Sequence, residues 1–295
     1  MAEIRTRDGT WTFDGEVLRI VPALDRRVNR LRKALGEITV PVAAISGIAF
    51  EQGRRRGRLR LRLRSGADPF TQAVAGRLPD DADPYRLVVE PDAFALAELL
   101  VDDVRNCRIV EQIPDGPTDR YLMPGPDVPL RVSVGDGTVT FDGEHVRLEW
   151  NSSASAGKRS VGPRLFRVGD LVSVEWERAT FTDYGCLRFT TGGEPGRLPP
   201  EKDPSCLAWT FGDGGTAPLV AAAVTARLPH PYGTPRPASD ADSPANVPGR
   251  DTASEGEHDV DALLRRLREL GELRRRGVLT EEEFTLAKQA VLRRL

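Results

Sequence analysis

The stretch TWTFDGEVLRI at residues 10–20 returns as TVTFDGEHVRL at residues 138–148. Three further blocks recur in the same order: GEITVPVAAISGIAFE (36–51) aligns with GPRLFRVGDLVSVEWE (162–177), GRLRLRLRSG (57–66) with GCLRFTTGG (from Gly185), and GRLPDDADP (76–84) with GRLPPEKDP (196–204). Blocks that recur in a fixed order predict two homologous domains of about a hundred residues each. Two copies make a tandem pair and not a solenoid.

Each repeat is predicted to be mainly β structure that ends in a helix. The segments TWTF and EVLRIV flank Asp14-Gly15, which is typical of a hairpin with a type I′ turn, and Asp142-Gly143 repeats the pattern. In ITVPVAAISGIAFE, Gly47 leaves room for a bulge. We expect the closing helices in DAFALAELLVDDVRN (92–106) and APLVAAAVTARL (217–228).

The spacing in the first of these helices predicts one apolar face, formed by Phe94, Leu96, Leu99, Leu100 and Val104. Antiparallel hairpins finished by one amphipathic helix follow the plan of a pleckstrin-homology-like barrel, in which the helix plugs an open end of a curved sheet. Another small α+β barrel fits the strand count as well. The expected fold class is mainly β (α+β), with two tandem pleckstrin-homology-like barrel domains, each closed by a C-terminal helix.

The composition changes along the chain and predicts five segments. These are a first repeat (1–108), a connector rich in Pro and Gly (109–134), a second repeat (135–229), a disordered linker (230–258) and a short helical hairpin (259–295). The connector contains Tyr121, Leu122 and Met123, so we expect it to be ordered and packed on one domain.

The last 37 residues contain two amphipathic helical patterns separated by Gly277. Thr280 and Glu283 form a capping box at the start of the second pattern. So short a hairpin buries too little surface to be stable alone, which predicts that it associates with a partner or with itself. The residues expected to mediate oligomerisation are Val260, Leu263, Leu264, Leu267, Leu270, Phe284, Val291 and Leu292.

Two resemblances cover most of the chain. The tail resembles the short C-terminal (SHOCT) domain of bacteria, through GVLTEEEF at residues 277–284 and Lys288, although Gly271 departs from that pattern. The body, with TFDGE, ALGEITVP, DPYRLVVE and PDGPTDRYLMPGP, resembles an actinobacterial domain of unknown function, number 4429 in its series. The resemblance implies tandem pleckstrin-homology-like domains without an assigned activity, and a tail that mediates oligomerisation or attachment to partners.

Bulk properties narrow the class of protein. Of 295 residues, 39% are hydrophobic and 29% charged, which is typical of a globular protein, and a net charge of −2 argues against a globally basic nucleic-acid binder. No apolar run approaches the roughly 20 residues of a membrane span. The charged N-terminus shows no secretory signal. We therefore expect a cytoplasmic protein, or one peripheral to the inner face of the membrane.

The residues that most often carry chemistry are few and scattered. Cysteine occurs at three positions without paired spacing, and histidine at His145, His230 and His258. Neither a nucleophile–histidine pair nor a metal-ligand spacing is recognisable. We expect no enzymatic activity, no catalytic residues, no metal and no cofactor.

Arginine is the strongest signal in the chain. GRRRGRLRLRLRSG (53–66) alternates leucine with arginine over its second half, which predicts a strand with a charged outer face. The equivalent strand of the second repeat keeps only Arg188, so the fold itself does not require the arginines. The candidate anion- or lipid-binding residues are Arg26, Arg27, Arg30, Arg32, Lys33, Arg54, Arg55, Arg56, Arg58, Arg60, Arg62 and Arg64.

Charge is also unevenly distributed within the first repeat. Residues 23–66 hold twelve basic and three acidic side chains, and residues 67–105 hold three basic and nine acidic ones. If these segments fold onto opposite sides, the domain is strongly polarised.

The leading hypothesis is a non-catalytic adaptor that binds a protein partner and self-associates through its tail. The alternative is peripheral binding to anionic membrane lipid, and nucleic acid ranks last because no aromatic residues are interleaved with the arginines.

Overall fold

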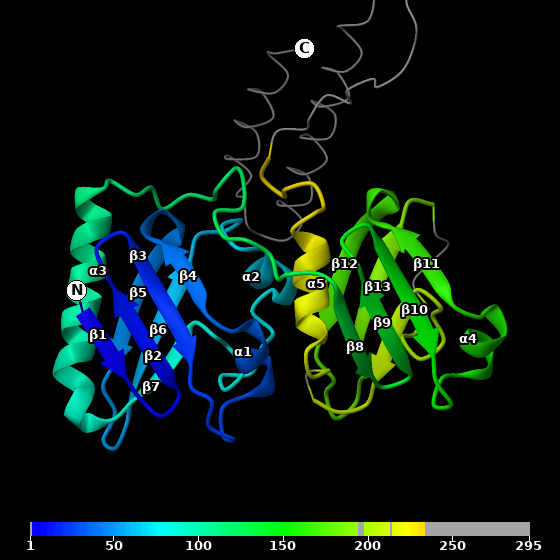
Figure 1. Ribbon diagram of the computed structural model, residues 1–295, viewed down its shortest axis with the longest axis horizontal. Helices are drawn as coiled ribbons and strands as arrows, with labels where there is room; N and C mark the ends of the chain where they lie inside the picture. The colour runs from blue at the N-terminus through cyan, green and yellow to red at the C-terminus, as the bar shows by residue number, and fades with distance from the viewer. Residues whose placement is uncertain (1, 194–197, 213, 234–295) are drawn as a thin grey trace, which may run out of the picture. The chain divides into compact units, whose positions relative to one another are not determined.

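The computed structural model describes residues 2–193, 198–212 and 214–233, and within them one order of strands recurs (Figure 1). The first repeat contains β1 (Ala2–Arg5), β2 (Gly9–Phe13), β3 (Val17–Pro22), α1 (Arg30–Leu35), β4 (Ile38–Pro41), β5 (Ile45–Glu51), β6 (Gly57–Leu63), α2 (Pro69–Val74), β7 (Arg86–Val89) and α3 (Phe94–Val110). The second contains β8 (Leu130–Val134), β9 (Gly137–Phe141), β10 (His145–Trp150), α4 (Ala156–Val161), β11 (Arg164–Arg167), β12 (Leu171–Glu177), β13 (Gly185–Thr191), β14 (Cys206–Trp209) and α5 (Ala217–Thr225). Strand β8 lies within the range that the composition assigned to the connector.

The strands form four antiparallel sheets, in the orders β1-β2-β3-β4, β5-β6-β7, β11-β10-β9-β8 and β12-β13-β14. A mainly β fold is thus confirmed. The expected barrel is not closed within the described residues, since no strand ladder joins the two sheets of either repeat. Short 3₁₀ turns at Val42–Ala44 and Val168–Asp170 redirect the chain from one sheet to the next in both copies.

The closing helix of each repeat contacts the first strand of both its sheets: α3 packs on β1 and β5, and α5 packs on β8 and β12. The buried stripe of α3 consists of Ala97, Leu100, Val101 and Val104. The predicted face was therefore partly wrong, because Leu96 and Leu99 are 48% and 52% exposed. A helix seated between two sheet edges buries the narrow stripe i, i+3, i+4, i+7, and Leu96 and Leu99 lie beside it.

Both Asp-Gly pairs lie in hairpin loops, but the loops are not type I′ turns. Phe13 pairs with Leu18, so the loop between them has four residues. Only the glycines have positive φ, 107° at Gly15 and 111° at Gly143. The Asp14 carboxylate accepts the backbone N–H groups of Glu16 and Val17, both at 2.9 Å, and this bonding replaces the predicted turn geometry. The bulge expected at Gly47 is confirmed by a register shift between Ile45 and Gly47.

The connector is bonded to the first repeat. The Thr118 N–H donates to the Ser65 carbonyl at 2.9 Å, and the N–H groups of Leu122 and Met123 donate to Ala67 O at 2.8 and 3.1 Å. The Met123 side chain is buried. The connector therefore lies along the first repeat as an ordered segment.

Helix α2 has no counterpart among the described residues between β13 and β14, and it joins the two repeats. It packs against α5 and β12 of the second repeat. Every residue of α5 is buried as a result. Arg77, just after α2, donates from Nη1 to the Trp176 carbonyl at 3.0 Å. The described residues of both repeats thus share one hydrophobic core and fall within one compact unit.

The end of the second repeat also reaches the first. His230 Nε2 lies 2.9 Å from the Gly66 carbonyl oxygen, and its ring packs edge-on against Tyr121 with centroids 4.6 Å apart. The predicted linker began at residue 230, whereas residues 230–233 are held here. The expected hairpin and its eight oligomerisation residues lie outside the described residues. Of the helices that are described, none has the length and apolarity to cross a bilayer.

Candidate functional site

The alternation read from the arginine-rich strand is confirmed on β6. Leu59 and Leu61 are buried, while Arg58, Arg60 and Arg62 are exposed on the outer face of the sheet. Arg54, Arg55 and Arg56 are exposed in the turn between β5 and β6. These six arginines remain candidates for an external ligand.

Arg64 is different, because its guanidinium is used inside the protein. It donates to the carbonyl oxygens of Gly116, Ala43 and Pro117 at 2.8, 3.0 and 3.2 Å. Its role in the structure is to bind the connector to the first repeat, so the prediction that it belongs to an open basic patch was wrong.

The other candidate basic residues of the first repeat form a second cluster, which lies on and before α1. Arg26, Arg27 and Arg30 are exposed. Lys33 Nζ donates to the Asp25 carbonyl at 3.3 Å. Arg32 is only 5% exposed, so it lies in the interior and not on the predicted surface.

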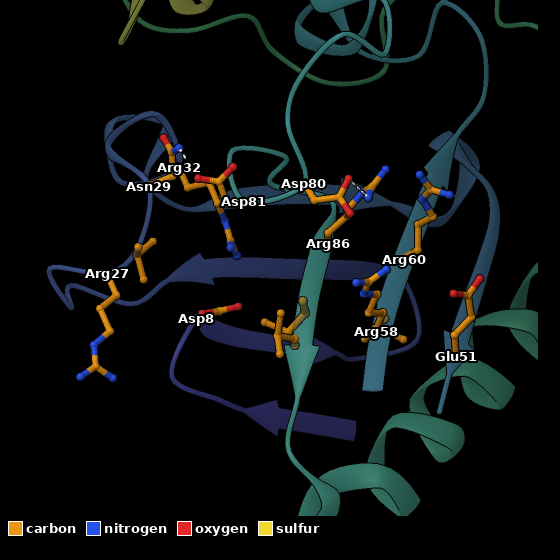
Figure 2. Close-up of a pocket in the computed structure, with 14 residues that line it drawn as sticks. Asp8, Arg27, Asn29, Arg32, Glu51, Arg58, Arg60, Asp80, Asp81 and Arg86 are labelled. Atoms are coloured by element: carbon orange, nitrogen blue, oxygen red, sulfur yellow. Dashed lines mark hydrogen bonds and ion pairs between the residues drawn. The ribbon is translucent and has the colours of Figure 1, made fainter. Parts of the chain in front are cut away.

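Parts of both clusters converge on a cavity of about 280 Å³ in the first repeat (Figure 2). The two clusters contribute Arg27, Arg32, Arg58 and Arg60. The sequence reasoning missed the other charged residues that line it: Arg86, Asp8, Glu51, Asp80 and Asp81. Strand β7 contributes Leu87 and Val88 to the wall.

At this cavity the basic and acidic segments of the first repeat lie together and not on opposite sides, so the condition for a polarised domain is not met here. Asp80 and Asp81 come from the acidic segment, yet they lie beside arginines of the basic segment (Figure 2). Arg86 forms ion pairs with Asp80 and with Asp83, the latter at 3.0 Å between Nε and Oδ2. The Asn29 amide donates to Asp81 at 3.1 Å. The loop before β7 folds back onto the sheet and so brings the acidic segment to the basic strand.

Arg32 is a charged group of the cavity with a buried donor that lacks a hydrogen-bond acceptor. Burial lowers the pKa of its guanidinium, and the negative charges of Asp8, Asp83 and Asp81 act in the opposite direction. Its Nε is buried and has no hydrogen-bond acceptor. A buried unpaired donor is costly, so an acceptor supplied by a ligand would bind favourably there.

In the second repeat, the charged groups at the equivalent positions form hydrogen bonds within the protein. Lys158 and Arg32 each lie four residues before the glycine that ends their short helix, and Asp136 and Asp8 each precede the first glycine of a strand. Lys158 is fully buried and donates to Asp136 Oδ2 at 2.6 Å and to the Cys206 carbonyl at 2.7 Å. The ammonium also lies 4.9 Å from the centroid of the Trp150 ring. The second copy thus hydrogen-bonds these groups internally, although Asp136 and Ala208 also line a cavity there, of about 490 Å³.

The groups that could carry other chemistry lie apart from this cavity. His145 Nδ1 is 3.6 Å from Asp142 Oδ2 on an exposed hairpin, and Cys107 Sγ donates to the Gly15 carbonyl at 2.8 Å. Within residues 2–193, 198–212 and 214–233, no three His, Cys, Asp or Glu side chains gather so that they could hold a metal ion. The absence of activity, metal and cofactor stays a prediction.

Comparison with known proteins gives one family. A family model described as "Domain of unknown function (DUF4429)" matches residues 11–105 and again residues 139–225, which together make up more than half of the chain. The two matched segments correspond to the two repeats. No curated protein matches the chain.

Proposed function

Because the chain belongs to the DUF4429 family, which both of its repeats match, we propose that it is a non-catalytic adaptor that binds a protein partner through its first repeat. The repeats act as one body, since α2 and α5 pack against each other. In this proposal the second repeat packs against the first and holds it in place, and the first repeat contains the cavity that binds the partner.

The observation that carries this proposal is the mixture of charges in the cavity. Five arginines and four carboxylates line it. Carboxylates are repelled by anionic lipid headgroups, whereas protein surfaces present both signs and can match such a pattern. The mixed lining therefore favours a protein partner over a lipid surface.

A second candidate function rests on a different part of the first repeat. Arg54, Arg55 and Arg56 lie in the β5–β6 turn, and all three are exposed. Anionic lipid attracts such residues by about 1 kcal/mol for each arginine. Peripheral binding to anionic membrane is thus the alternative function.

We also propose a fold type for the two repeats and for the C-terminal segment. Four strands, three strands and a C-terminal helix in each repeat support a pleckstrin-homology-like fold opened into two sheets. The leucine pattern of residues 259–295 supports a SHOCT-like hairpin that oligomerises the adaptor. Association through such a tail would raise the effective concentration of the cavities. A cytoplasmic location remains our expectation.

Photo-crosslinking in the native host tests the adaptor directly. A benzophenone amino acid replaces Asp81 at the cavity or, as the matched control, Glu201 at the homologous position of the second repeat. We expect one protein to be captured from position 81 and not from position 201. Equal capture at both positions would contradict a partner site in the first repeat.

Co-sedimentation of the full chain with vesicles tests the lipid alternative. For the adaptor we expect no binding to vesicles that contain 30–50% anionic lipid (about the range of charged membranes), at low or physiological salt. Binding that salt abolishes, and that R54S/R55S loses while R167S/R178S retains it, would replace the adaptor by a membrane protein. Both variants remove two exposed arginines.

A further inference from the structure

Strand β7 is the outer strand of the sheet β5-β6-β7. The alternation of hydrogen-bonded and non-bonded residue pairs between β6 and β7 shows which backbone groups of β7 face outward. The Leu61 N–H donates to the Tyr85 carbonyl at 2.9 Å, so this pair exchanges hydrogen bonds across β6 and β7. Bonded and non-bonded pairs alternate in an antiparallel ladder. The pairs Arg60–Arg86 and Arg58–Val88 are consequently non-bonded pairs. The N–H and C=O groups of Arg86 and Val88 therefore point away from β6.

These outward groups face the cavity, which Arg86 and Val88 both line. Figure 2 shows Asp8 and Arg32 on one side of β7, and Arg58 and Arg60 on β6 on its other side. In the described part of the chain, no backbone or side-chain group bonds the amide or carbonyl of Val88 on the cavity side. The edge of β7 is thus an unfilled strand position.

The same edge is filled in the second repeat. There Asp136 donates its N–H to the Ala208 carbonyl at 3.1 Å and accepts the Ala208 N–H on Oδ1 at 2.9 Å. Lys158 bonds the Cys206 carbonyl. Ala208 and Cys206 are the counterparts of Val88 and Arg86 in the strand register. The chain thus closes one of two homologous strand edges and leaves the other open.

The turns of the two copies differ: the Asp8 N–H donates to Thr6 Oγ1 at 3.1 Å, whereas Val134 stands at the position of Thr6, and a second difference lies at the next residue. Gly135, before Asp136, has a φ of 54°, and a Cβ atom at that position would collide with the Ala208 carbonyl. Arg7 occupies the equivalent position before Asp8. An arginine is strained at a φ near 54°, and its Cβ atom would clash with the strand if the turn came as close as it does in the second repeat. The turn of the first repeat therefore lies further from β7.

We propose that the open edge of β7 binds an extended, acidic peptide segment of a partner protein as an added β-strand. The inference deepens the proposed adaptor function and rests on it. Backbone groups of the peptide would bond Arg86 and Val88, which gives affinity, and the flanking charges would select its side chains.

The acidic character follows from the outer face of the sheet. Arg58, Arg60 and Arg62 of β6 and Arg86 of β7 all point to that face. Side chains of an added strand alternate between the faces, so every second residue of the peptide lies on this face beside Arg86 and Val88, with Arg58 and Arg60 one strand further away on β6. Long peptide carboxylates at those positions reach across β7 to the guanidinium groups of Arg58 and Arg60, which form no ion pair within the described residues.

The test titrates the full chain with a fluorescein-labelled nonapeptide of alternating threonine and glutamate, followed by fluorescence anisotropy. Two further probes keep its length: one has lysine in place of glutamate, and one is N-methylated at alternate backbone amides. We expect the glutamate peptide to bind, and the other two to bind about tenfold more weakly or not at all, because each has lost one required interaction.

Two pairs of variants test the edge itself. V88P removes an N–H that β6 does not use, so an edge strand tolerates it, whereas V88A keeps that N–H. R7G allows the turn to approach β7 as Gly135 does in the second repeat, whereas R7A removes the same charge and keeps the Cβ. We expect V88P and R7G to weaken binding about tenfold, and V88A and R7A to bind like the wild type.

The outcomes separate this inference from the adaptor function. Binding that V88P, R7G and N-methylation all leave unchanged, but that R58S/R60S abolishes, overturns the added strand and leaves a charged protein-binding surface. Equal binding of the lysine peptide overturns the acidic specificity. If no peptide binds at about 1 mM, the added strand is wrong. If in that case the chain also sediments with anionic vesicles, the adaptor function fails with it.

Discussion

Lys158 and Arg32 occupy equivalent positions, and each carries a charge into the interior of its repeat. Lys158 is fully buried with a carboxylate and a carbonyl as partners, whereas Arg32 keeps a free donor beside a cavity. A buried charge is tolerated only when it is paired and hydrogen-bonded. The two residues are therefore expected to respond differently to substitution.

Replacing Lys158 by alanine is expected to lower the free energy of unfolding by about 3–5 kcal/mol, because it leaves Asp136 buried without its cation. Urea unfolding followed by tryptophan fluorescence measures the loss. The matched control is K202A, which removes an exposed lysine and is expected to change stability by less than about 0.5 kcal/mol. Similar losses for the two variants would show that the buried pair contributes little.

Asp14 and Asp142 predict a pH dependence. Bonds from the Val17 and Glu16 amides lower the pKa of Asp14, and bonds from the His145 and Glu144 amides lower that of Asp142, in both cases from 3.8. A lowered pKa in the folded state stabilises the fold above the unfolded pKa, and the effect is lost as the pH falls through the folded value. The melting temperature of D14A/D142A should be lower than that of the wild type, and the difference between them should be largest at neutral pH. The gap should narrow below about pH 3.8, and a constant gap would contradict the assignment.

At the scale of elements, α2 decides how the repeats are joined. It is an addition to the first repeat, and it packs on α5 of the second. The connector crosses near the same place, where a Cβ atom at Gly125 would lie 2.5 Å from the Ala226 Cβ. The junction depends on this close approach of the backbone to α5.

G125A is therefore expected to destabilise the protein by about 1–3 kcal/mol, because the added methyl group overfills a packed contact. G116A in the same connector is the control, since nothing lies within 4 Å of its added Cβ and its φ is not positive. Its expected change is less than about 0.5 kcal/mol. Urea unfolding of both variants tests the junction, and equal stabilities would show that the connector yields without cost.

The sequence predicts the elements well where they repeat and poorly where they are short. Strand alternation in β6, the duplicated hairpins and both closing helices follow from local periodicity. Helices α1, α2 and α4 have six residues each, too few to show a helical period. The exposed Leu96 and Leu99 were misplaced because sequence periodicity does not tell how narrow a groove the helix enters.

The candidate site was half predicted. Arginines mark it in the sequence, but Asp8, Asp80 and Asp81 reach it only through tertiary folding, and local composition places the last two in an acidic segment separate from the arginines. The duplication offers a usable signal for Asp8, because an aspartate precedes the same glycine in both copies. Nothing in the composition indicates that Arg64 binds the connector or that Arg32 is buried.

At the scale of the whole molecule, the two repeats form one body, and the sequence reasoning had treated them as separate domains on a connector. A shared core, α2 against α5, and His230 against Gly66 bind each copy to the other. Neither repeat keeps its full set of contacts without its neighbour. Orientation between the copies is thus set by packing and not by a linker.

Oligomerisation belongs to the same scale and concerns residues 259–295. The full chain is expected to exceed the monomer mass of 32.4 kDa in light scattering, and a chain ended at residue 257 is expected to be a monomer. Within the full chain, L263S/L267S should dissociate the oligomer, whereas R265S/R268S should not, because only the leucines belong to the apolar stripe. An unchanged mass after truncation would contradict assembly through the tail.

The turn that holds Arg7 in one copy and Gly135 in the other has a consequence in terms of the genetic code. Each of the six arginine codons becomes a glycine codon by one change at its first base. Whichever codon specifies Arg7, one point mutation thus provides the residue with which the second copy closes its own strand edge. An open copy and a closed copy of the repeat thus differ at this position by a single nucleotide change, and the proposed peptide-binding edge is altered by one point mutation.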